Sequence, residues 1–179
     1  MNCDLVKGKR AIEFGSGTGL VGMAARACGA LQVMLTDMEE HVPVLRGTME
    51  LNQHLGESGW LQAQAHEWGV NLEAFLGVPG GAQFDVVLGS DIIYEPKSWV
   101  GLVTSIDYFS SLEAVVLIAY RRRHEDDHQF FTALGEKFNI DVVPFESKMF
   151  PLARDINIFR CKRKTVAATA PSGTAAVAE

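Results

Sequence analysis

Residues 10–20 read Arg10-Ala11-Ile12-Glu13-Phe14-Gly15-Ser16-Gly17-Thr18-Gly19-Leu20 and give the clearest indication of the fold. The first half of this stretch is a short apolar run typical of a strand, and residues 20–28 favour a helix. The alternating glycines between them let the backbone turn sharply and approach a ligand without a Cβ in the way. The free N–H groups that begin the helix would face whatever occupies the turn. We predict a nucleotide-like ligand above the first strand; the alternative is a tight turn without a ligand.

The spacing of the glycines narrows the class of ligand. A dinucleotide fingerprint requires a third glycine at position 20, which is Leu20, and a Walker-type loop requires a lysine that is missing here. Glu13, beside the turn, would repel a pyrophosphate but tolerate a cation. The sequence therefore favours a positively charged sulfonium ligand over a polyphosphate, and it disfavours a dehydrogenase.

Composition limits the functional classes. The chain has 179 residues, 47% of them hydrophobic, which is ordinary for one globular domain. The net charge of -6 argues against nucleic-acid binding, which depends on basic residues. Without a signal peptide or an apolar run of membrane length, we expect a soluble, cytoplasmic protein with no membrane partner; the nucleus is the alternative compartment.

The cysteines give a separate expectation. Cys3, Cys28 and Cys161 are odd in number and lack the spacing of metal ligands. We therefore expect a reducing compartment rather than a disulfide framework, and no metal site.

The order of predicted elements indicates the fold class. Helices are predicted over residues 20–28, 42–55, 99–109 and 124–138, and strands over 10–14, 31–36, 60–66, 84–90, 114–120, 140–145 and 156–161. Helices separate the earlier strands, so these should be parallel, whereas the last two are joined by a loop alone and should pair antiparallel. We predict a Rossmann-like, doubly wound α/β fold: a mostly parallel seven-stranded sheet with an antiparallel last strand and helices on both faces. Residues 1–164 would form this domain, and residues 165–179, rich in Ala, Thr and Pro, a disordered tail.

Two residues beyond the glycines are candidates for ligand contacts. Asp37 ends the second strand about 20 residues after the turn, where α/β nucleotide folds hold a ribose diol; alternatively it caps a helix or a turn. Trp68 follows the third strand, and its flat face would suit an adenine ring. Core or rim packing is the alternative for this tryptophan.

These motifs together resemble a known family. Glu13 to Gly22 looks like motif I of the seven-β-strand S-adenosylmethionine-dependent methyltransferases, and Asp37 is similar to the acidic residue after their second strand. Asp91-Ile92-Ile93-Tyr94 resembles the D-x-x-Y motif of lysine methyltransferase family 16, the methyltransferase-like group. Glu67-Trp68-Gly69 and the stretch Arg122…Asp126…Phe130 are similar to that family as well, so that the resemblance covers residues 5–162.

The resemblance implies S-adenosyl-L-methionine as cofactor and a lysine side chain of a protein as methyl acceptor. The donor would lie across Gly15, Ser16 and Gly17. Its other contacts would be Glu13 near the amino-acid portion, Asp37 at the ribose, Trp68 at the adenine and Ser90 in the pocket wall. Family members usually carry a segment before motif I whose strand pair and tryptophan help to enclose the cofactor. This chain begins almost at motif I, so we expect that wall to be missing.

Asp91 and Tyr94 would border the channel for the incoming lysine. We hypothesise that Asp91 orients the ammonium group and that Tyr94 offers an aromatic wall or a hydroxyl contact. The structural alternative is that Asp91 caps the turn before Pro96 and Tyr94 packs in the core.

Three other functions stay open at this point. A small-molecule methyltransferase fits the same motifs. A nucleic-acid methyltransferase is disfavoured by the acidic charge and by Ser90-Asp91-Ile92-Ile93, which stands where amino-methylating enzymes carry an Asn/Asp-Pro-Pro-aromatic motif. A non-catalytic scaffold would keep the fold and bind no cofactor. We expect a monomer in each case.

Overall fold

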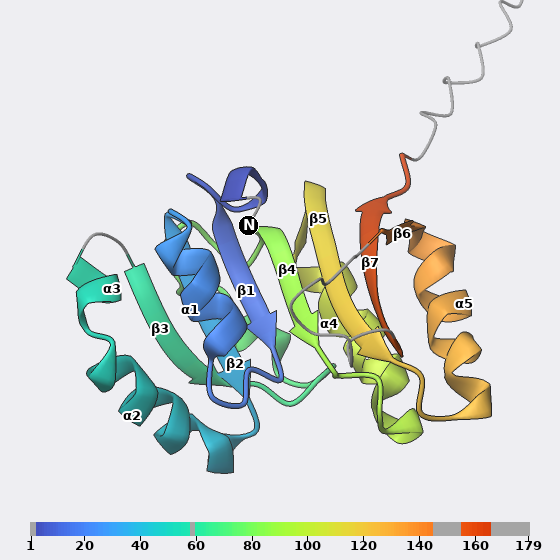
Figure 1. Ribbon diagram of the computed structural model, residues 1–179, viewed down its shortest axis with the longest axis horizontal. Coiled ribbons are helices and arrows are strands. Elements are labelled where there is room, and N and C mark those ends of the chain that lie inside the picture. Colours follow the sequence, from blue (N-terminus) through green and yellow to red (C-terminus); the bar gives the residue numbers. More distant parts are fainter. Residues whose placement is uncertain (1–2, 58–59, 145–154, 166–179) are drawn as a thin grey trace, which may run out of the picture.

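The computed structural model describes residues 3–57, 60–144 and 155–165, and its centre is a seven-stranded sheet in the order β3-β2-β1-β4-β5-β7-β6 (Figure 1). The parallel strands are β1 (Arg10–Phe14), β2 (Gln32–Asp37), β3 (Trp60–Ala65), β4 (Phe84–Ser90) and β5 (Ser110–Arg121). The last strand, β7 (Ile156–Arg163), runs antiparallel to β5 and to β6 (Phe138–Val143), between which it lies. The predicted fold class is thereby confirmed.

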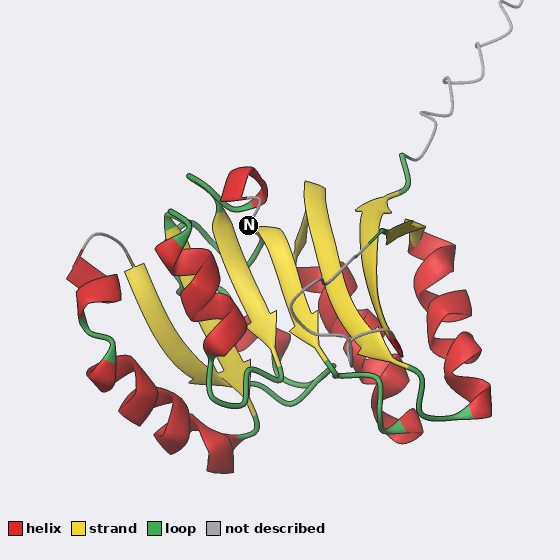
Figure 2. Ribbon diagram, in the orientation of Figure 1, coloured by secondary structure: helices red, strands yellow, loops and turns green. Residues whose placement is uncertain are grey.

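Helices cover both faces of the sheet (Figure 2). On one face, α1 (Leu20–Ala27) contacts β1 and β2, and α2 (Val42–Leu51) and α3 (His54–Glu57) contact β3. On the other face, α4 (Trp99–Phe109) contacts β4 and β5, and α5 (His128–Lys137) packs on α4. The chain passes from β1 to β2 and β3 on one side of β1, and then crosses to β4 on the other side of β1. The carboxyl ends of β1 and β4 therefore flank the crevice where open α/β sheets bind ligands.

Element boundaries differ from the predicted ones in a few places. The helix predicted over residues 42–55 is interrupted after Leu51, and the one predicted from residue 124 begins with a 3-10 turn, Glu125–Asp127. Strands β5 and β6 begin earlier than predicted because α4 and α5 lead into them without a loop. The predicted tail, apart from Thr165, lies outside the described residues.

Alternation along the strands divides the core into two layers. Ile12 and Phe14 of β1 belong to the large cluster under α4 and α5, whereas Ala11 belongs to the cluster under α1. Glu13 shares the face of Ala11 because side chains alternate along a strand. The same rule places Asp37 on the face of Val33 and Leu35, so Glu13 and Asp37 point to the same side of the sheet.

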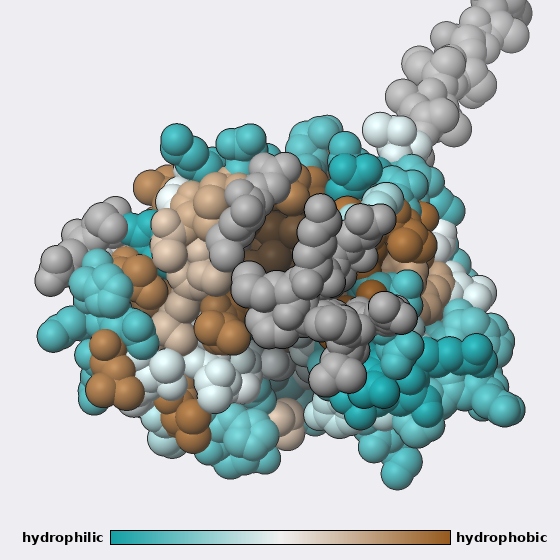
Figure 3. All heavy atoms as spheres, viewed as in Figure 1, coloured by the Kyte–Doolittle hydropathy of each residue, from teal (hydrophilic) through white to brown (hydrophobic). Residues whose placement is uncertain are grey.

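Part of the sheet on the α1 side has no helix over it in the described part of the chain. Leu117 of β5 packs against the α1-side cluster but is only half-buried. In Figure 3, hydrophobic residues gather in a hollow beside α1 on this face. The ligand crevice lies elsewhere, at the carboxyl ends of the strands.

The structure joins Cys3 and Cys28 in a disulfide, so the expectation that the cysteines form no disulfide is wrong for this pair. These two residues are far apart in the sequence. The short helix Cys3–Leu5, however, lies beside the C-terminal end of α1, where Cys28 is the C-cap residue. Cys161 is buried and free. No helix among the described residues has the length and apolar character needed to cross a membrane.

Close packing between α1 and the sheet gives a testable prediction. A Cβ added to Gly22 would meet the side chains of Leu35 and, at 2.8 Å, the Glu13 carboxylate. Gly22→Ala should therefore lower the free energy of unfolding by about 1–3 kcal/mol, measured by urea denaturation. Gly47→Ala is the matched control, because a Cβ there has no neighbour within 4 Å; it should stabilise α2 by up to about 1 kcal/mol. Equal effects of the two substitutions would contradict this account of the packing.

Candidate ligand-binding site

A cavity of about 570 Å³ opens at the carboxyl ends of β1, β2, β3 and β4. It combines residues from four separate connections of the fold. Six sequence-predicted site residues line it: Gly15, Gly17, Asp37, Trp68, Asp91 and Tyr94. The predicted residues Glu13, Ser16 and Ser90 are not among those that line it.

Gly15 and Gly17 contribute to the cavity in different ways. Gly15 and Gly17 both have left-handed backbones, with φ of 59° and 55°. A Cβ on Gly15 would lie 2.8 Å from the side chain of Ile92, so this glycine permits close packing under the cavity. A Cβ on Gly17 would meet nothing within 4 Å, although Gly17 lines the cavity. The space above Gly17 is therefore open to a ligand.

Asp37 fixes this turn from the neighbouring strand. Its Oδ2 accepts a hydrogen bond from the Gly17 N–H at 2.7 Å, and its Oδ1 accepts one from the Met38 N–H at 2.8 Å. His41 Nδ1 lies 2.8 Å from the same Oδ1, and this hydrogen bond and charge raise the pKa of His41. Sequence reasoning missed His41; its position four residues after Asp37, at the start of α2, was the available signal.

Glu13 and Ser16 are buried beneath the turn. The Glu13 carboxylate accepts a hydrogen bond from the Gly22 N–H at 2.9 Å, inside α1. Burial raises the pKa of Glu13 to about 7. The Ser16 hydroxyl accepts from the Thr36 N–H at 3.0 Å and so ties the turn to β2. The structure thus gives both residues an internal role, and their predicted contacts with a ligand stay predictions.

The loop after β3 reaches the cavity through an unusually close contact with α4. Gly101 of α4 leaves room for the backbone of Trp68 and Gly69: a Cβ on Gly69 would lie 2.8 Å from the Gly101 Cα. The Gly69 N–H donates to the buried hydroxyl of Ser105 at 2.8 Å, and His66 shares that hydroxyl at 2.9 Å. This contact holds the half-buried Trp68 at the cavity wall.

The segment after β4 forms the opposite wall. Asp91 has a left-handed backbone, with φ of 57°, and its N–H donates to the Ala119 carbonyl of β5 at 2.9 Å. Tyr94 is 55% exposed, so the alternative that it packs in the core is wrong. Arg123, which sequence reasoning did not single out, donates to the Asp91 carboxylate with Nε and Nη2, the former at 3.0 Å.

Acidic groups outnumber basic ones around the cavity. The lining carboxylates are Asp37, Glu67, Asp91 and Glu95, and the lining basic groups are Lys97 and His41. His66 also lines the cavity, and burial lowers its pKa to about 4, so it is neutral at pH 7. Such a lining suits cationic ligands better than phosphates.

The comparisons with known proteins agree with this architecture. A family model described as lysine methyltransferase matches residues 2–137, more than half of the chain. The chain belongs to the lysine methyltransferase family. The match includes the glycine turn, Asp37, Trp68 and the Asp91–Tyr94 segment.

Relatives within the family cover nearly all of the described fold. Protein N-lysine methyltransferase METTL21A of Danio rerio is 36% identical over 87% of this chain and 66% of its own length. The protein of the same name from Mus musculus is 32% identical over 89% of this chain and 68% of its own length. The chain thus spans about two thirds of the length of these relatives.

Solved structures show the same fold at low sequence identity. An S-adenosylmethionine-dependent methyltransferase from Mesorhizobium loti has a TM-score of 0.65 at 15% identity, covering 89% of this chain and 93% of that one. Magnesium protoporphyrin IX methyltransferase from Synechocystis PCC 6803, solved with bound S-adenosylmethionine, has a TM-score of 0.60 at 15% identity, covering 89% and 72%. These similarities support the fold of this family member.

Burial of Glu13 predicts a pH dependence of stability. Because its pKa is raised from 4.5 to about 7 on folding, the folded state retains a proton that the unfolded state has lost between those values. Stability from this group is therefore lost as pH rises from about 4.5 to 7, by on the order of 3 kcal/mol. Glu13→Gln keeps the acceptor for Gly22 but cannot ionise.

Urea denaturation of both proteins at pH 5 and pH 8 checks this. The variant should gain stability relative to the wild type at pH 8. His66 contributes stability in the opposite direction, lost as pH falls from about 6.5 to 4, but equally in both proteins. An identical difference between the proteins at the two pH values would contradict the assignment.

Proposed function

We propose that this chain binds S-adenosyl-L-methionine and transfers its methyl group to a lysine side chain of a protein. One observation carries the proposal: a single cavity brings the glycine turn, Asp37 and Trp68 together with Asp91 and Tyr94. The first group suits the donor and the second a lysine side chain as methyl acceptor. Relatives named as protein N-lysine methyltransferases support the choice of acceptor.

The residues of the cavity fit the cofactor. The open space above Gly17 provides a place where a ligand can approach the backbone, and Asp37, which lines the cavity at the adjacent strand end, would accept hydrogen bonds from ribose hydroxyls. Trp68 would flank the adenine, because a flat aromatic face favours stacking. The acidic lining would favour the sulfonium charge over a phosphate-bearing nucleotide.

The protein's contribution to the chemistry is alignment. S-adenosylmethionine supplies a methyl carbon on a positively charged sulfur, which keeps the electron pair of the broken S–C bond. The amine must arrive as a neutral nucleophile, although its ordinary pKa lies near 10.4. Asp91 would orient the amine and Tyr94 would line its approach. Such positioning can lower a barrier by up to about 7–11 kcal/mol in ideal cases.

A cytoplasmic location, a monomeric state and a disordered tail remain predictions. The substrate protein is a prediction by class only.

Calorimetric titration with S-adenosylmethionine, followed by incubation of the chain with labelled donor and a cell lysate, tests the proposal. Saturable binding and a label located on lysine are expected. A folded sample that binds no donor would overturn the proposal and favour a scaffold. Binding with label only on small molecules would favour a small-molecule methyltransferase.

Substitutions of Asp37 and Asp91 should distinguish donor binding from methyl transfer. Asp37→Asn should weaken donor binding about tenfold, because it loses a charged acceptor. Asp91→Asn should leave donor affinity within about twofold and lower the transfer rate about 10- to 100-fold.

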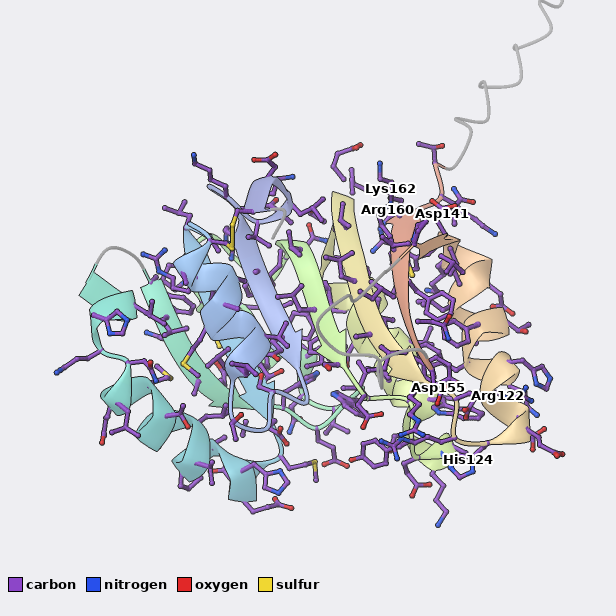
Figure 4. All side chains as sticks on the ribbon, viewed as in Figure 1. Arg122, His124, Asp141, Asp155, Arg160 and Lys162 are labelled. Atoms are coloured by element: carbon purple, nitrogen blue, oxygen red, sulfur yellow. A yellow bond between two sulfur atoms is a disulfide. The ribbon has the colours of Figure 1, made fainter. Side chains whose placement is uncertain are left out.

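Asp141→Asn is the matched control, since this exposed residue lies on β6 at the other end of the sheet (Figure 4). It should change neither quantity. Equal loss of binding and transfer in Asp91→Asn would make Asp91 a cofactor or folding residue instead.

A further inference from the structure

The loop after β5, residues 122–124, contacts both candidate acceptor residues. Arg123 binds the Asp91 carboxylate through Nε and Nη2, in a forked arrangement. His124 Nε2 lies 3.1 Å from the Tyr94 carbonyl oxygen. Figure 4 shows Arg122 and His124 at the edge of the sheet where the parallel strands end, away from Arg160 and Lys162. The loop therefore lies behind the acceptor wall of the cavity, which is the wall that Asp91 and Tyr94 form.

A buried carboxylate fixes this loop from below. Asp127 is 2% exposed, and its Oδ2 accepts hydrogen bonds from the Tyr120 hydroxyl at 2.5 Å and from the N–H groups of Arg123 and His124 at 2.8 and 2.9 Å. Burial opposes its ionisation, but these hydrogen bonds outweigh burial and lower the pKa of Asp127. Asp127 is thus a charged anchor that orients the two residues of the loop that reach the acceptor wall.

The Arg123–Asp91 pair affects how a lysine would be held. A carboxylate without a partner stabilises the ammonium form of a nearby lysine and raises its pKa. That form has no lone pair and cannot accept a methyl group. A guanidinium forked onto the carboxylate balances its charge, leaves it able to accept a further hydrogen bond, and itself disfavours a second cation.

We propose that Arg123 is a positioning residue that neutralises Asp91, so that Asp91 accepts a hydrogen bond from the neutral target amine instead of holding it as a cation. The lysine ammonium gives a proton to solvent water before transfer and so becomes the neutral amine. Asp127 acts through the loop, by fixing Arg123. This inference rests on the proposed function, because it assigns a role within the acceptor half of the same cavity.

Other charged groups surround this position and have to be separated in a test. The charged groups at and around the Arg123–Asp91 pair come from four connections of the fold. The connections after β4 and β5 supply Asp91, Glu95, Lys97, Arg123, His124 and, in the 3-10 turn, Asp127. The connections after β3 and β2 supply Glu67, Asp37 and His41. His124 is the ionisable group in direct contact with the acceptor segment besides Arg123. His124→Gln therefore belongs in the experiment as a separate variant.

The pH dependence of kcat on the labelled lysine protein tests the proposal. In Arg123→Gln the rising limb should move to higher pH by about 0.5–1 unit, with kcat about 3- to 10-fold lower at pH 7 and KM not raised. Arg123→Lys, which keeps the charge, should restore most of the profile. Arg121→Gln is the matched control: it removes the same charge, but Arg121 pairs with Asp155, 3.7 Å away, instead of Asp91.

Arg121→Gln should keep the wild-type profile, and the profile of His124→Gln shows what the imidazole adds. A uniform fall of kcat in Arg123→Gln, with no shift of its pH profile, would overturn the proposal and leave Arg123 a structural role. Asp127→Asn should shift the profile in the same direction as Arg123→Gln, because the anchor of Arg123 is weakened. A shift in the opposite direction would contradict the role given to Asp127.

A second measurement does not depend on turnover. n-Butylammonium serves as a probe of the lysine head group, and its binding is followed by the amide NMR signals of Asp91 and Tyr94, with and without S-adenosylhomocysteine. Arg123→Gln should bind it about 5-fold more tightly than the wild type or Arg121→Gln. Equal binding by all three would overturn the role of Arg123. A wild type that binds the probe but transfers no methyl group would contradict the proposed function alone.

Discussion

The hydrogen bond between the Gly17 N–H and the Asp37 carboxylate, 2.7 Å long, is the constraint on which the rest of the site depends. It joins the turn after β1 to the end of β2 and so fixes the position of that turn relative to the sheet. The left-handed backbone at Gly17 is needed for this geometry, and the absence of a side chain there leaves the cavity open. The same carboxylate meets His41, so it connects the turn to the start of α2 as well.

The remaining walls depend on close contacts that small residues allow. Trp68 reaches the cavity because Gly69 and Gly101 bring the loop after β3 against α4. Asp91 reaches it because its left-handed backbone turns the chain at the end of β4 while its N–H stays bonded to β5. Each wall is thus set by backbone geometry next to the sheet, and the side chains facing the ligand are held by rigid elements. This is the arrangement expected of a site that works by alignment.

Much of the fold and part of the candidate site could be predicted from the sequence, because strand periodicity and glycine spacing are local signals. The mostly parallel sheet and the antiparallel last pair follow from them, and so does the placement of Gly17 and Asp37 at one edge. The resemblance to the family led to Asp91 and Tyr94, whereas the order of the strands in the sheet came from the structure. The direction of Glu13 toward Gly22 was predictable in principle from alternation with Ala11, but its hydrogen bond to a helix required the packed structure. The Cys3–Cys28 disulfide and the contact of Arg123 with Asp91 depend on segments that only the fold brings together, whereas His41 beside Asp37 is a local contact that the sequence spacing could have indicated.

We propose that the glycine turn, Asp37 and Trp68 together bind the cofactor. The most direct test is a titration of the nitrogen-15-labelled chain with S-adenosylhomocysteine, followed by NMR. We expect saturable shifts of the Gly15 and Gly17 amides and of the Trp68 indole, with the cavity near Tyr108 and Arg163 at the opposite edge of the sheet unaffected. A folded chain whose Gly17 and Trp68 signals stay unchanged at saturating ligand would contradict it.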